Sequence, residues 1–275
     1  RVAARIAAGA LLFAGAVAAA PTRALDTTVF RANYVIAVGG IVVGHASAQS
    51  RFTDAGYVAS VSGSTSGVSR IVSDASAKLS GSGRIAGGRV IPSSYVLDTR
   101  ENGFVTHVTM GMRGGRVTDL VAMPRLSMAP DRVPLTPTHK TNVVDPLGAF
   151  IVPFERPGIP AGRTVCNRTI KVFDGWTRFD VQLYYKETKA VDGGDDMYAV
   201  RVIVCGARYV PVAGHRTVNV RELAGNERLE VWLVPLGSLR VLVPYRLIIG
   251  TRIGDIVITS TRFSMTGGDQ RASAE

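Results

Sequence analysis

Four polar residues in the second half of the chain could act together in acid and base chemistry. Asp174, Arg178 and Asp180 share one short stretch, and His215 lies in a second. A carboxylate and an imidazole in contact can exchange a proton near neutral pH, so Asp174, Asp180 and His215 could serve a cell-wall or lipid hydrolase. No nucleophile or oxyanion-binding motif accompanies them. We therefore expect a structural cluster in which Arg178 pairs with Asp174 or Asp180. We also expect a binding function rather than an enzymatic one.

Two glycine-rich stretches come close to enzyme motifs. The residues 63–67 have the glycine spacing of a nucleophile elbow, but Thr65 stands where the serine should be. The residues 81–87 miss the spacing of a dinucleotide-binding loop by one residue. We interpret both stretches as Ser/Gly-rich turns.

The sequence predicts neither a metal site nor another cofactor. The histidines have no short ligand spacing and no neighbouring cysteine, as a zinc site would require: His45, His107, His139 and His215. An acidic stretch lacks the alternating ligands and the final glutamate of a calcium loop, and we expect a solvated turn at Asp192, Asp195 and Asp196.

Residues 1–24 have the features of a secretory signal peptide. Arg1 and Arg5 give a basic start, an apolar run follows over residues 6–20, and Thr22-Arg23-Ala24 fits a small-x-small cleavage site. The run is shorter than the ~20 residues of a membrane-spanning helix. We expect export to the periplasm and a mature chain that begins at Leu25.

The two cysteines, Cys166 and Cys205, suit a disulfide. An even number of cysteines in an oxidising compartment favours pairing, and a closed zinc site would need four ligands. We therefore predict a bond between the two.

The formal net charge of +11 favours acidic partners. In an exported protein these would be anionic lipids, lipopolysaccharide or an envelope protein, with peripheral membrane contact, rather than nucleic acid. The alternative is that the positive charge reflects the base composition of the genome and not a function. Only five of the 32 basic residues are lysines, and such an arginine bias is typical of a GC-rich genome.

Period-two alternation broken by glycine and Asx turns predicts an all-β domain over residues 25–265, followed by a flexible tail over 266–275. Gly39-Gly40, Asn102-Gly103 and Asp174-Gly175 predict hairpins. The last of these would join strands over 164–173 and 176–186. In the second of these strands one face is apolar, with Phe179, Val181, Leu183 and Tyr185.

A proline-rich connector is predicted over residues 124–160, since its eight prolines exclude a central strand. Within it, Asp145 as N-cap and Pro146 at the first helical position predict a short helix over 145–151. Leu147, Phe150 and Ile151 would form its apolar face. We expect this face to meet a concave sheet, and these three side chains to contact a ligand.

The chain resembles an uncharacterised family of exported proteobacterial proteins, domain of unknown function 3108. The resemblance spans nearly the whole mature chain, and it rests on a hairpin over 34–44, on 132–137 and 144–147, on Cys166 with Val172-Phe173-Asp174-Gly175, on Cys205 with 208–215, and on Val231-Trp232. It implies a long antiparallel meander curled into an open barrel or β-spiral, similar to periplasmic lipoprotein carriers, with the short helix on its concave side. Gly148 departs from the family pattern, where a serine is expected. The family carries no known catalytic residues.

Three functions remain open from the sequence. The first is a non-enzymatic periplasmic protein that binds a hydrophobic or acidic envelope ligand, or supports envelope integrity. The second is the hydrolase outlined above. The third is a structural envelope scaffold without a small ligand.

Overall fold

The computed structural model describes residues 27–67, 73–127, 129–155, 160–191, 200–236 and 239–267. The predicted leader, the predicted acidic turn and residues 268–275 of the predicted tail lie outside the described residues. The strands are, in chain order, β1 (Thr28–Val38), β2 (Ile41–Thr53), β3 (Gly56–Thr65), β4 (Ala75–Ala86), β5 (Arg89–Glu101), β6 (Phe104–Arg113), β7 (Arg116–Met123), β8 (Val152–Pro153), β9 (Arg168–Phe173), β10 (Arg178–Val191), β11 (Val200–Ala213), β12 (Leu229–Pro235), β13 (Val241–Ile249) and β14 (Ile256–Thr266). The described helices are α2 (Gly162–Cys166) and α3 (Thr217–Ala224), with 3-10 turns η1 (Pro137–Lys140) and η2 (Gly148–Phe150).

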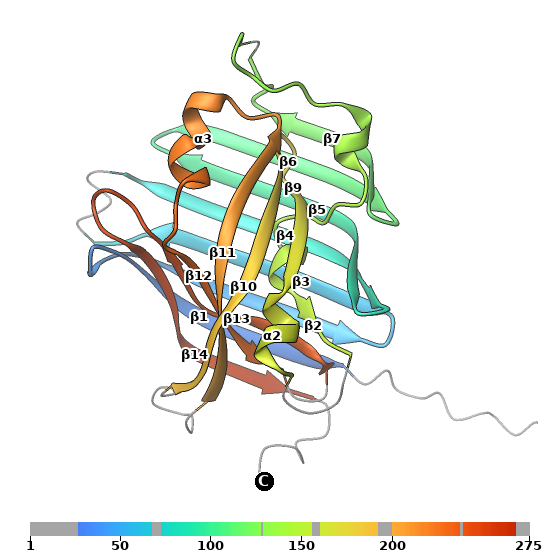
Figure 1. Cartoon of the computed structure of the whole chain (residues 1–275), viewed down its shortest axis with the longest axis vertical. Helices are drawn as coiled ribbons and strands as arrows, with labels where there is room; N and C mark the ends of the chain where they lie inside the picture. The colour runs from blue at the N-terminus through green and yellow to red at the C-terminus, as the bar shows by residue number, and fades with distance from the viewer. Residues whose placement is uncertain are drawn as a thin grey trace, which may run out of the picture.

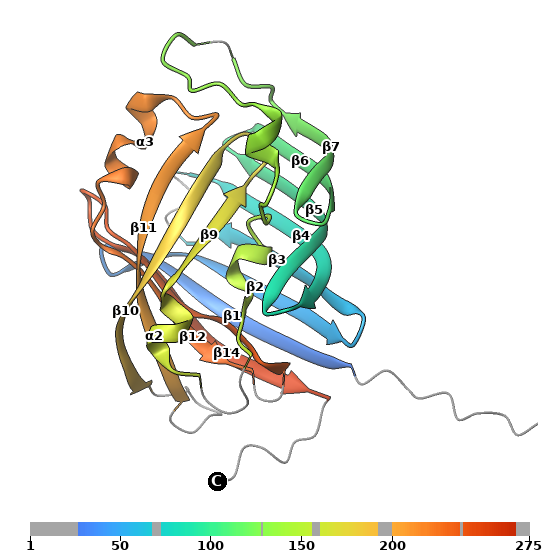
Figure 2. The same ribbon diagram turned by 45° about the vertical axis from the view of Figure 1, so that its right-hand side comes forward.

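All strands belong to one antiparallel sheet of 14 strands. Its order is β7-β6-β5-β4-β3-β2-β1-β14-β13-β12-β11-β10-β9, with β8 paired to β13 beside this path. The sheet is open, because β7 and β9 form its two ends. Figures 1 and 2 show the strands β9–β11 crossing in front of β2–β6, so the sheet curls back over itself. The predicted all-β antiparallel meander is confirmed.

Two of the predicted hairpins are built from residues that accept a positive φ. Gly39 and Gly40 have φ values of 55° and 86° between β1 and β2. Asn102 and Gly103 have φ values of 47° and 87° between β5 and β6. Positive φ at both central residues is the signature of the type I′ turn, which matches the twist of the flanking strands.

The two glycine-rich stretches that we interpreted as turns are mostly strand. Residues 63–65 end β3, and residues 81–86 end β4, so only their last residues turn. Close packing explains the glycines: a Cβ on Gly83 would lie 2.6 Å from the carbonyl oxygen of Ile91 and 2.9 Å from the ring of Tyr57. Glycine within a strand is typical of such close approach.

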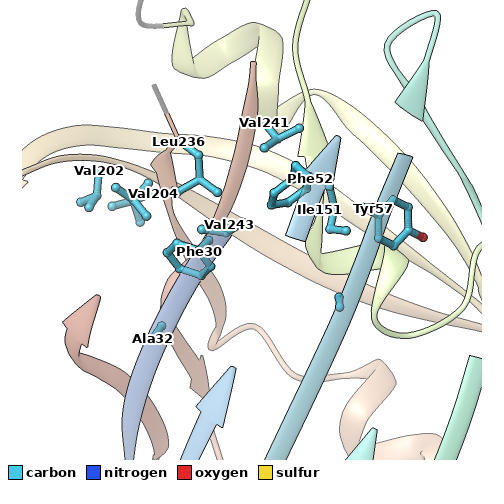
Figure 3. Packing of buried hydrophobic residues seen from close by; sticks show 12 residues of the cluster. Phe30, Ala32, Phe52, Tyr57, Ile151, Val202, Val204, Leu236, Val241 and Val243 are labelled. Atoms are coloured by element: carbon cyan, nitrogen blue, oxygen red, sulfur yellow. The ribbon is translucent and has the colours of Figure 1, made fainter. Parts of the chain in front are cut away.

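Buried apolar side chains of the described residues form three clusters, and two of these join distant parts of the curled sheet. The first joins Phe30, Phe52 and Tyr57 of β1–β3 to Val204 of β11 and Val243 of β13 (Figure 3). The second joins the β5–β6 part of the sheet to the connector and to β9, through Tyr95, Val108, Met110, Val143, Leu147 and Phe173. Strands far apart in the sequence are thus held together by apolar burial, the main favourable contribution to folding.

The helix predicted over 145–151 is shorter than expected. A single 3-10 turn, η2, follows Asp145, whose Oδ1 atom accepts hydrogen bonds from the backbone N–H groups of Leu147 and Gly148 at 2.9 and 3.0 Å. The Asp145 side chain thus binds the N–H groups at the start of the turn, but the N-cap position of η2 is Leu147 and not Asp145 as predicted. The chain then extends into β8, which pairs with β13 and ends the helical path.

The segment before β9 differs from the strand predicted over 164–173, because residues 162–166 form α2. Gly162 allows α2 to lie directly on β10, since a Cβ there would be 2.2 Å from the Tyr185 ring. This contact brings Cys166 to β11, where its Sγ atom lies 2.01 Å from that of Cys205, at bonding distance as the sequence predicts. The described residues contain no helix with the length and apolar character to cross a membrane.

Candidate functional site

An apolar cavity of about 240 Å³ lies between the C-terminal strands and the connector. Its wall is formed by aliphatic and aromatic side chains of β9–β13, by the connector and by Leu223 of α3. The apolar members on the sheet are Ile170, Val172, Phe179, Val181, Leu183, Ala207, Tyr209, Leu229, Val231, Leu233, Leu247, Ile248 and Ile249. Pockets for small ligands have this apolar and concave character.

The strand register explains why most of these side chains share one face. Val181 pairs with Ile170 of β9 and with Tyr209 of β11, and Leu183 pairs with Ala207. Directly paired residues of antiparallel strands project to the same side of a sheet. The alternating apolar residues of β10 thus continue across the neighbouring strands into one apolar wall.

The connector supplies the opposite wall through Pro146, Ala149, Phe150 and Val152. Phe150 is 42% exposed, so the cavity reaches the surface beside its ring. Leu147 and Ile151, the other two residues predicted to contact a ligand, are instead buried in the two interior clusters and do not line this cavity. The 3-10 geometry of η2 separates the three side chains that an α-helix would have aligned.

Glu230 is the acidic residue of the lining, and its carboxylate is already engaged. Its Oε1 atom pairs with Nζ of Lys186 at 2.5 Å, and its Oε2 atom accepts a hydrogen bond from the Trp232 indole at 3.0 Å. Although burial acts against it, these contacts leave the pKa of Glu230 below its usual value. The carboxylate therefore stays ionised and paired.

The predicted polar cluster is structural in its contacts. The carboxylate of Asp174 accepts hydrogen bonds from the backbone N–H groups of Trp176 and Thr177, at 2.8 and 2.6 Å, and from the Thr177 hydroxyl at 2.6 Å. It thereby closes the loop between β9 and β10. Arg178 is 6% exposed and places Nη2 2.6 Å from Oδ1 of Asp180. The pairing of Arg178 is thus with Asp180 and not with Asp174.

His215 is buried beside the same loop, and its backbone ties the end of β11 to the connector. The carbonyl of His215 accepts a hydrogen bond from the N–H of Val133 at 3.0 Å. Of the other histidines, His107 contacts Asp98 with Nδ1 at 2.7 Å from Oδ1, and His139 caps η1. Within the described ranges, no group of three His, Cys, Asp or Glu side chains is placed to hold a metal ion.

Asp145 is the most perturbed carboxylate near the cavity. It is fully buried, and this burial raises its pKa to about 6, even though its hydrogen bonds from Gly148 and Leu147 act in the opposite direction. Gly148 lies against it, since a Cβ there would be 2.8 Å from Oδ2 of Asp145. Asp145 therefore holds the connector in place and titrates close to neutral pH.

Most of the cavity wall was not identified as a site from the sequence. The alternation in β10 marked Phe179, Val181 and Leu183 as a buried face, but a local pattern does not distinguish a filled core from a cavity wall. Ala207 and Val231 carry no distinguishing signal at all. Their role depends on the register that brings them beside β10.

Comparison with known proteins gives one structural match and a family. A crystal structure of a β-barrel-like protein of domain of unknown function DUF1849 from Brucella abortus is similar, with a TM-score of 0.49 and 8% sequence identity over 87% of this chain and 98% of that chain. No curated protein matches the sequence. The family described as "Protein of unknown function (DUF3108)" matches residues 30–261, which is most of the chain, and the protein therefore belongs to this family.

Proposed function

We propose that this protein is a non-enzymatic protein of the bacterial envelope that binds a hydrophobic ligand in the apolar cavity. The observation that carries the proposal is the cavity itself. Protein interiors are close-packed, so an apolar space of about 240 Å³ is more than a packing defect. The leader-like residues 1–24 and the cysteine pair support an exported location.

An alkyl chain fits the chemistry of the lining. The wall residues offer almost only carbon to a ligand, and the one carboxylate is paired with Lys186 and Trp232. Each methylene removed from water contributes about 0.8 kcal/mol, so burial of a chain of about eight carbons would contribute roughly 6 kcal/mol before the cost of association. Micromolar binding corresponds to about 8 kcal/mol, so ligands with longer alkyl chains should bind more tightly than a chain of this length.

A competition experiment tests this proposal. The neutral fluorescent probe N-phenyl-1-naphthylamine should bind the purified protein and be displaced by dodecanol. Phe150→Asp should weaken both ligands about tenfold or more, because a charge at the mouth must be desolvated when the chain enters. The variant should fold normally, since the Phe150 side chain is 42% exposed.

Phe104→Asp is the matched control. Phe104 is 81% exposed at the start of β6 and does not line the cavity, so its replacement should leave binding unchanged. Absence of probe binding to the wild type, or equal loss in both variants, would overturn the proposal.

A further inference from the structure

A second cavity of about 740 Å³ adjoins the apolar one. It lies where β9 and the connector meet the turns that follow β4 and β6, and its lining includes Gly88 and Gly115 from these turns. Ala149, Val152 and Ile170 line both cavities. The two spaces are therefore direct neighbours across three small or aliphatic side chains.

The second cavity is basic. Arg84, Arg89, Arg168 and Lys171 line it, and its lining contains no aspartate or glutamate. Glu155 lies at the rim, where a Cβ on Gly88 would be 2.9 Å from its Oε1 atom, but the Glu155 side chain is exposed. Within the described residues, none of the four cations has a carboxylate at ion-pair distance.

Arg168 is the most constrained of these cations. It donates one hydrogen bond, from Nη1 to the carbonyl of Pro153 at 3.2 Å, while its Nε atom is buried and has no partner. Burial lowers the pKa of Arg168, as expected for a cation removed from water. By contrast, the buried Arg178 is paired with Asp180. Arg168 is only partly buried, but a charge without a counterion in such a position still costs free energy, and a bound anion would offset that cost.

The strand geometry joins this cation to the apolar wall. Arg168 and Ile170 are two positions apart on β9, so their side chains project to the same side of the sheet. Ile170 lines the apolar cavity, and Arg168 lines the basic one. Strand β9 thus places the N–H donors of the Arg168 guanidinium next to the wall of the apolar cavity.

From this arrangement we infer that the ligand is an anionic amphiphile, whose alkyl chain occupies the apolar cavity and whose oxyanion headgroup binds Arg168. Arg84, Arg89 and Lys171 line the same cavity and add positive charge to it. A guanidinium matches the geometry of a phosphate or carboxylate group through paired hydrogen bonds. The inference rests on the proposed function, which requires only that the apolar cavity binds an alkyl chain.

The probe displacement assay with three ligands tests this inference separately from the proposed function. The ligands are dodecyl phosphate, dodecanol and inorganic phosphate, and the binding of inorganic phosphate is also measured by calorimetry. We expect dodecyl phosphate to bind about tenfold or more tightly than dodecanol, since hydrogen bonds to charged groups are the strong ones. Arg168→Gln should reduce this preference to about threefold or less while the affinity for dodecanol stays the same. Arg51→Gln, on an exposed position of β2 outside both cavities, is the matched control and should keep the preference.

A second variant protects the test against misfolding of Arg168→Gln. Arg89 and Lys171 are exposed, so Arg89→Gln/Lys171→Gln should fold and should also lower the preference for dodecyl phosphate. Equal binding of dodecyl phosphate and dodecanol would overturn the inference and leave the proposed function intact. If neither alkyl ligand binds, both the inference and the proposed function are overturned. Both are also overturned if inorganic phosphate binds as tightly as dodecyl phosphate and dodecanol does not bind.

Discussion

The Oδ1 atom of Asp145 accepts a hydrogen bond of 3.0 Å from the backbone N–H of Gly148, and this contact fixes the turn that carries the cavity residues Ala149 and Phe150. The carboxylate is at the same time fully buried. It therefore combines a structural role with a proton equilibrium near neutral pH.

Stability should consequently depend on the protonation of Asp145. Burial raises the pKa from 3.8 to about 6, so between these values the folded protein holds the proton and the unfolded chain releases it. The free energy of unfolding should fall as pH rises through this window. Asp145→Asn removes the effect, and relative to the wild type it should gain up to about 3 kcal/mol between pH 4 and pH 8 in urea unfolding. Parallel pH profiles of the two proteins would contradict this.

The bond between Cys166 and Cys205 should stabilise the fold by restricting the unfolded chain. The two residues are 39 positions apart, and the chain-entropy relation gives about 4 kcal/mol for a loop of this length. Cys166→Ala/Cys205→Ala should lower the urea midpoint and keep the far-UV circular dichroism spectrum. Reduction of the wild type should have a similar effect. Titration of two free thiols in the native protein would show that the bond is not formed.

The loop between β9 and β10 should depend on Asp174. Its carboxylate accepts three hydrogen bonds inside the loop, and Asp174→Ala should cost about 2–3 kcal/mol because two backbone N–H groups lose their partner. Asp54→Ala, in the exposed turn between β2 and β3, is the control and should cost less than about 0.5 kcal/mol. Comparable losses in the two variants would refute the structural role.

Gly214 should be irreplaceable for a reason beyond its backbone angle. It has a φ of 84°, and a Cβ there would lie 2.0 Å from the carbonyl oxygen of Trp176. Gly40 has a nearly identical φ of 86° with no atom within 4 Å of the added Cβ. Both alanine variants carry the cost of a positive φ, about 1 kcal/mol, but Gly214→Ala should lose at least about 2 kcal/mol more. Equal unfolding midpoints would show that the loop relaxes freely around residue 214.

Local signals in the sequence predict the features of the fold that depend on local physics. The Gly39-Gly40 and Asn102-Gly103 hairpins follow from the conformational freedom of their own residues. The side-chain hydrogen bonds of Asp145 are likewise local, because the carboxylate binds N–H groups only two and three positions away.

The features that the sequence did not predict depend on distant partners. Gly83 is a glycine because the ring of Tyr57 and the backbone of β5 leave no room for a side chain, and not because the chain turns there. The helix α2 replaces a predicted strand where Gly162 meets Tyr185. The sequence did not predict Arg168 as a binding residue, since only the fold reveals that its side chain is partly buried beside an apolar wall, with a buried Nε atom that has no partner.

The pairing of β1 with β14 joins the β1–β7 half of the sheet to the β9–β14 half. Val38 pairs with Ile256 and Val29 with Thr266, so this seam joins the strands furthest apart in the sequence. Suppose that the start of β1 were linked to the end of β14 and that the chain were cut between β7 and β9. The strands would then follow one another along the sheet in chain order, as one uninterrupted meander. The strand order is thus a circular permutation of the simplest antiparallel topology, with β1 and β14 side by side in the middle of the sheet. Because contacts at long sequence separation form slowly, the two half-sheets should fold first and the seam should close last.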